Sequence, residues 1–100
     1  MAINIGVIGG YNSVNITAAA PTTTLIKTGE GILHSITFNK PVATGVVKID
    51  DAITDTTPVL GTITTPASPQ PFTVIYDIHF TTGLTIVTST AAQDITVSYI

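Results

Sequence analysis

The last third of the chain, residues 71–100, reads PFTVIYDIHFTTGLTIVTSTAAQDITVSYI. Between residues 72 and 80, every even-numbered position carries a large apolar side chain, and most odd-numbered positions are polar. Successive side chains of a β-strand point to opposite faces, so this period of two is typical of a half-buried strand. The pattern predicts a strand at residues 72–80 whose core face consists of Phe72, Val74, Tyr76, Ile78 and Phe80.

The two segments that follow repeat this alternation over shorter lengths. Residues 84–89 come after a turn that contains Gly83, and residues 94–100 place Ile95, Val97 and Tyr99 on one face. We predict that the three segments form a three-strand meander with one apolar face. Such a face has to be covered by a second layer of the same protein.

The rest of the chain contains further short runs rich in Ile, Val and Thr, which pack well on a pleated sheet. We predict strands at residues 13–18, 22–27, 32–38, 44–49 and 59–64. The two glycines at residues 28–31 indicate a tight hairpin turn. In the strand that follows this turn, Ile32, Ile36 and Phe38 are predicted to share one face, with His34 among them.

These segments amount to about eight strands with regularly spaced turns, and no long stretch has a helical period. The spacing predicts an all-β fold, an antiparallel two-sheet sandwich that is jelly-roll-like and has no substantial helix. We expect residues 13–100 to form a single β-sandwich domain. Residues 1–12 are expected to be an N-terminal arm or a first strand.

The composition of the chain points to contact with other subunits. Charged residues make up 9% of the sequence, whereas about 25% is usual in globular domains. A surface so poor in charge is weakly protected against association, so we expect much of it to pack against neighbours. The alternative is a monomer whose surface is covered by Thr and Ser. With three Lys, no Arg and a net charge of −3, the chain is not expected to bind nucleic acid or a membrane surface.

The N-terminal residues are candidates for partner contact. Ile3, Ile5 and Val7 alternate with smaller or polar residues before the chain reaches two glycines at positions 9 and 10. An alternating segment of this kind is either a short first strand or an arm that adds to a neighbour's sheet. We predict that Ile3, Ile5, Val7 and the following Tyr11 contact a partner protein.

Two groups of residues are candidates for a chemical site. Asp50, Asp51 and Asp55 could supply some of the oxygen ligands of a hard cation, but their spacing matches no defined calcium loop, which favours a solvated loop. His79 is predicted to lie near Asp77 on one strand face, as a general base requires. No hydroxyl residue lies in a recognisable nucleophile motif, so an exposed or interfacial histidine is the preferred interpretation.

The remaining residues give no sign of an active site. The chain has no cysteine, which excludes disulfides and thiolate metal sites. Tyr76 and Tyr99 fall on the predicted core face, so only Tyr11 is free by pattern to stack on a sugar. We therefore predict a protein that is not an enzyme and that uses no cofactor and no metal.

The tail of the chain resembles small virion proteins of tailed bacteriophages. The resemblance lies in residues 80–88, FTTGLTIVT, in residues 94–99, DITVSY, and in the earlier GVVKIDD at residues 45–51. It covers residues 32–100 and implies a β-sandwich subunit on the outside of a capsid or tail.

The function implied by this resemblance is capsid decoration. Decoration (cement) proteins of this kind sit on the outer shell as trimers and tie neighbouring capsomers together. The resemblance thus implies a homotrimer that binds the major capsid protein, is made in the host cytoplasm and resides on the virion surface. The alternatives are a receptor- or glycan-binding module of a tail or fibre, and a tail connector subunit.

Overall fold

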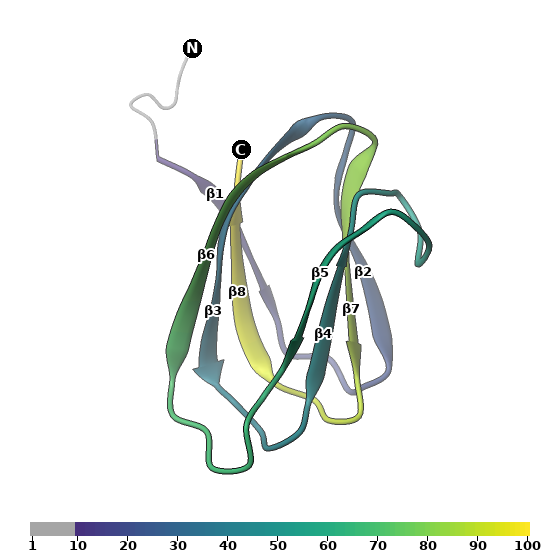
Figure 1. Ribbon diagram of the computed structural model, residues 1–100. Coiled ribbons are helices and arrows are strands. Elements are labelled where there is room, and N and C mark those ends of the chain that lie inside the picture. Colours follow the sequence, from purple (N-terminus) through teal and green to yellow (C-terminus); the bar gives the residue numbers. More distant parts are fainter. Residues whose placement is uncertain (1–9) are drawn as a thin grey trace.

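The computed structural model describes residues 10–100 and shows two β-sheets packed face to face (Figure 1). In this range all regular elements are strands. No helix that is long and apolar enough to cross a membrane is found among these residues. The predicted contact residues Ile3, Ile5 and Val7 lie outside the described residues. The strands are β1 (Asn12–Ile16), β2 (Thr22–Thr28), β3 (Gly31–Lys40), β4 (Val46–Asp50), β5 (Val59–Thr64), β6 (Phe72–Phe80), β7 (Gly83–Ser89) and β8 (Asp94–Tyr99).

Each sheet contains four antiparallel strands. The first sheet has the order β1-β8-β3-β6 and the second the order β2-β7-β4-β5. This order is that of the eight-stranded jelly roll, in which the chain passes repeatedly from one sheet to the other. The predicted all-β two-sheet sandwich is therefore confirmed, and the start of β1 and the C-terminus both lie at the upper end of the sandwich in Figure 1.

The predicted three-strand meander is wrong. β6 pairs with β3, β7 pairs with β2 and β4, and β8 pairs with β1 and β3, so none of the last three strands pairs with another. The predicted hairpin at residues 28–31 is wrong for the same reason, because β2 and β3 belong to different sheets. Alternation within a strand reports which side chains are buried, but it contains no information about which strand lies alongside.

The core lies between the sheets and confirms the predicted alternation of β6. The even-numbered residues of β6 pack toward the core, and its odd-numbered residues are exposed. Phe38 of β3 and Phe72 of β6 are paired in register, and their rings stack at a centroid distance of 4.4 Å. The apolar side chains with no exposed surface are Leu33, Ile36, Phe38, Val47, Ile49, Phe80, Leu84, Ile86, Ile95 and Val97.

A bulge in β3 moves Ile32 to the outer surface. The register of β3 shifts between Leu33 and Ser35 in its pairing with both β6 and β8. One irregular residue transfers the side chains before it to the opposite face, because the period of a strand is two. Leu33 is therefore fully buried and Ile32 is exposed. The prediction that Ile32 shares the face of Ile36 and Phe38 is wrong, since the irregularity at His34 interrupts the alternation.

Engineered disulfides test this topology. Thr37 of β3 and Thr73 of β6 lie opposite each other, with their hydroxyl oxygens 3.0 Å apart. Opposite residues of antiparallel strands have Cα atoms about 4.5–5.5 Å apart, within the range of a disulfide. We expect the double variant T37C/T73C to form an intramolecular disulfide in air, detected by thiol titration and peptide mapping. The variant T73C/T90C, which a β6–β7 hairpin would bring into register, should stay reduced; its cross-linking would contradict the jelly roll.

Candidate functional site

The outer face of the first sheet carries an unusual group of exposed apolar side chains. Ile32 lies directly opposite Ile100, since their backbones exchange hydrogen bonds of 3.1 and 2.9 Å. Ile75 lies on the same outer face, on the edge strand β6. We call this group the isoleucine patch; its members are Tyr11, Ile32, Ile75 and Ile100, which are 50%, 41%, 59% and 50% exposed.

Tyr11 is held in the patch by a histidine and a carboxylate. Its ring stacks on the imidazole of His34 at a centroid distance of 4.1 Å, with the planes 6° from parallel. Nδ1 of His34 donates a hydrogen bond of 2.5 Å to the carboxylate of Asp77. Asp77 has a positive φ of 48°, at the point where β6 is irregular opposite His34. The three residues connect the start of β1 with β3 and β6 across the outer surface.

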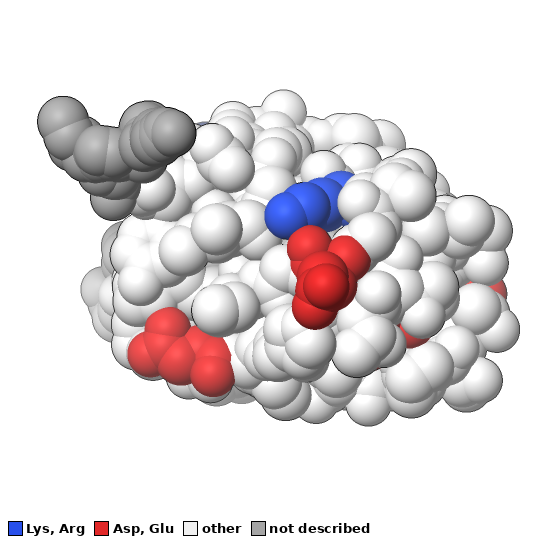
Figure 2. Space-filling model, turned by 90° about the horizontal axis from the view of Figure 1, so that it is seen from above, with Lys and Arg blue, Asp and Glu red and all other residues white. Residues whose placement is uncertain are grey.

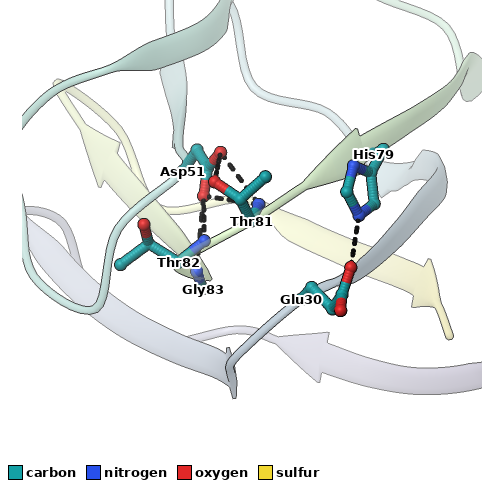
Figure 3. Close-up of polar contacts among 6 residues, drawn as sticks. All are labelled: Glu30, Asp51, His79, Thr81, Thr82 and Gly83. Carbon is teal, nitrogen blue, oxygen red and sulfur yellow. Dashed lines mark hydrogen bonds and ion pairs between the residues drawn. The ribbon is translucent and has the colours of Figure 1, made fainter.

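His79 and Asp77 both lie on the exposed face of β6, as predicted, but each hydrogen-bonds to a residue outside that strand. Nε2 of His79 instead donates to Glu30 in the β2–β3 loop at 2.9 Å, as Figure 3 shows. Asp77 is turned to His34 because the register irregularity brings these two side chains together. Among residues 10–100, no serine or threonine hydroxyl hydrogen-bonds to either imidazole, so neither histidine has the nucleophile that base catalysis would activate.

The predicted solvated acidic loop is wrong for two of its three carboxylates. Asp51 is buried, and its carboxylate accepts hydrogen bonds from the backbone N–H groups of Thr81, Thr82 and Gly83 and from the Thr81 hydroxyl (Figure 3). Burial alone would raise the pKa of Asp51, but these hydrogen bonds hold its pKa below the ordinary value. Asp51 thereby fixes the turn through which the chain crosses from β6 to β7.

Asp50 and Asp55 both face Lys48. The Lys48 ammonium lies 2.6 Å from the exposed Asp55 carboxylate and 3.6 Å from the fully buried Asp50 carboxylate. The hydrogen bond to Asp55 is the main cause of a raised Lys48 pKa, with a further contribution from Asp50. Asp50 and Asp55 therefore share Lys48, whereas Asp51 bonds to the β6–β7 turn. Within residues 10–100, no group of three or more possible ligands could hold a metal ion.

The opposite end of the sandwich is polar. Asn15, Asn39 and Asp94 are joined there by hydrogen bonds of 2.6 and 3.1 Å from the two amides to the carboxylate. Beside them is a surface depression of about 410 Å³, lined by Thr17, Lys40, Val42, Ala92, Gln93 and Asp94. Donors and acceptors suited to a polar ligand are present in this depression, but no aromatic ring lines it.

The tyrosines lie as the pattern predicted. Tyr76 and Tyr99 are half-buried and pack against the core, and burial raises the pKa of Tyr76. Tyr11 is the exposed tyrosine, but its ring already stacks on His34. One face of the Tyr11 ring is therefore occupied.

The burial of two polar residues, Asp51 and Gln93, was not predicted from the sequence. Besides Asp51, the amide oxygen of Gln93 accepts hydrogen bonds of 2.9 Å from the Val42 backbone and from the Thr65 hydroxyl. These bonds connect the β3–β4, β5–β6 and β7–β8 loops. The available signal was a lone Gln in the short TAAQD break before β8, a break that looked solvated.

Charged groups are few on the end of the molecule that carries the C-terminus and the start of β1 (Figure 2). Viewed from above, red and blue side chains form isolated spots on an otherwise uncharged surface. Comparison of the chain with protein-family models, with curated proteins and with solved structures finds no match. Eight large apolar side chains are exposed among residues 10–100, and the four of the isoleucine patch belong to the first sheet or adjoin its strands.

Replacement of Asp51 tests its role in the crossing turn. We expect Asp51→Asn to lower the free energy of unfolding by about 1–3 kcal/mol at pH 7, since the carboxamide group cannot accept all of these hydrogen bonds. The folded-state pKa of Asp51 is below its ordinary value of 3.8. Its contribution is therefore complete above that value and is lost as the pH falls through the folded-state pKa.

The measurement is urea denaturation of both proteins at pH 7 and in steps below pH 4. Asp55→Asn is the matched control, because it removes an exposed ion pair worth about 0–1 kcal/mol. A loss for D51N no larger than that for D55N, or one independent of pH, would contradict the assignment.

Proposed function

We propose that this chain is a non-enzymatic virion structural protein, a capsid decoration protein that binds the outer shell as a homo-oligomer and stabilises it. The observation that supports this most directly is the isoleucine patch. Three isoleucines and a tyrosine are exposed together on one sheet face of a chain with few charges. Apolar groups gathered in this way favour burial against another protein.

The architecture agrees with this proposal without deciding it. Jelly rolls occur in viral capsid proteins, in lectins and in cupins, so the fold alone leaves the function open. The scarcity of charge argues for a subunit that is covered on several sides. The resemblance of residues 32–100 to small phage virion proteins supports the same assignment.

Shell stabilisation would follow from mass action. A protein that binds the assembled shell and not the free subunits stabilises the shell by its binding free energy. In an oligomer, each bound subunit raises the effective concentration of the next, so individually weak contacts give firm attachment. Neither step requires a catalytic residue. The titratable groups around the patch agree with this, since His34 is paired with Asp77 and His79 with Glu30.

A second candidate function is receptor or glycan binding at a tail or fibre. The depression lined by Thr17, Lys40 and Asp94 favours it, because hydroxyl, ammonium and carboxylate groups are suited to sugar hydroxyls. The copy number per virion separates the candidates. Hundreds of copies correspond to decoration, and a handful correspond to a tail component or connector. A glycan array provides the complementary test.

Deletion of residues 1–10 tests the role predicted for the N-terminal segment. We expect the truncated protein to bind undecorated shells at least about tenfold more weakly, because it loses apolar contacts and the avidity that depends on them. Binding is measured by co-sedimentation of the purified protein with shells from a virus that lacks its gene. The control is a variant in which the charge-free segment is kept and Asp55 is replaced by Asn. Undiminished binding of the truncated protein would refute this role.

A further inference from the structure

The isoleucine patch has the size and chemistry of a receiving surface for one extended segment. Ile100, Ile32 and Ile75 lie on β8, β3 and β6 or their direct extensions, which are consecutive neighbours in the first sheet. Ile32 pairs with His79 and Ile75 pairs with Ser35, so Ile75 lies four residues, about 13 Å, along β6 from the residue opposite Ile32. Tyr11 closes the side of the patch toward β1, where its ring is fixed by His34.

The carboxylates near the patch already have hydrogen-bond partners. Asp77 is bonded to His34, and Glu30 is bonded to His79. A segment that binds here therefore gains nothing from charge of its own and would suffer from burying one. The chemistry of the patch selects an uncharged apolar strand.

Residues 1–9 have the matching chemistry. They read MAINIGVIG, with no charged side chain and with Ile3, Ile5 and Val7 at every second position. In an extended segment these three side chains share one face, and residues 3 and 7 are about 13 Å apart. That distance matches the offset along β6 between the residue opposite Ile32 and Ile75.

We propose that the isoleucine patch binds residues 1–9 of a second copy of this chain, with Ile3, Ile5 and Val7 facing Ile32, Ile75 and Ile100. The proposal rests on the homo-oligomer of the proposed function and names the contact that holds it together. When each copy gives one arm and receives one, the exchange forms a dimer or ring if the rotation between copies closes, and an open filament if it does not.

The direction of β1 favours a second copy over the same chain. β1 starts at Asn12 beside the patch and runs toward Ile16 at the polar end, because it pairs antiparallel with β8. The described part of the chain therefore begins at the patch end of the sheet. A segment of this chain would have to reverse at once to lie on its own patch, whereas the patch of a neighbour needs no reversal.

Cysteine cross-linking of the free protein tests the proposal. The chain has no native cysteine, so an equimolar mixture of the full-length variants I5C and I75C can form a mixed disulfide only between copies. Val59 of β5 in the second sheet, 43% exposed, provides the matched control receiver V59C. We expect I75C to give at least about tenfold more mixed disulfide with I5C than V59C does, because binding raises the local concentration of the thiols.

Light scattering of the same proteins gives an independent readout. We expect the full chain to be oligomeric, and both the variant lacking residues 1–9 and Ile75→Asp to be monomeric with unchanged circular dichroism. Val59→Asp should remain oligomeric. The proposal is overturned by a monomeric full chain, by equal cross-linking of V59C, or by a disulfide that forms only within one chain in the double variant I5C/I75C.

These measurements use no capsid, so they separate this proposal from the proposed function. An arm-exchanged oligomer that fails to bind any shell would leave the exchange intact and refute decoration. Shell binding by a monomeric full chain would support decoration and refute the exchange of arms.

Discussion

The constraint on which this structure depends is the passage of the chain between two sheets. Of the seven connections that join the eight strands, six cross from one sheet to the other, all except β4–β5. Each crossing takes backbone out of a ladder, and its polar groups then need other partners. Asp51 supplies them for the β6–β7 turn, and Gln93 supplies them where three loops meet. Two buried polar side chains thus fix connections that hydrophobic pattern cannot specify.

This constraint also explains what could be read from the sequence. The bounds of β5 (Val59–Thr64) and β6 (Phe72–Phe80) agree with the prediction, because alternation is a property of one strand and its two environments. Strand partners could not be predicted. β6 pairs with β3, from which it is separated by more than thirty residues, and no local pattern in the sequence indicates this pairing. The predicted position of Ile32 was wrong for a related reason. The bulge at His34 arises from the pairing of β3 with both β6 and β8.

The candidate site was likewise predictable only where it depends on a single strand. Exposure of Tyr11 followed from its pattern, but its stacking on His34 depends on β1 and β3 being two places apart in one sheet. Asp77 was expected beside His79, its neighbour two residues along, and instead pairs with a residue from another strand. Among the three acids, identity and spacing looked alike, and only the fold separates the buried Asp50 and Asp51 from the exposed Asp55.

The jelly roll also determines where an N-terminal extension begins relative to the isoleucine patch. The first and last strands are neighbours in it, so the start of β1 and the end of β8 meet at one end of one sheet. Ile100 and Tyr11 are consequently brought to the same outer surface as Ile32. A chain that extends upstream from this point starts beside an apolar face without having to cross the molecule. In a protein with so few charges, little opposes association of that face, and the identity of the partner then depends on which apolar segment is most concentrated nearby.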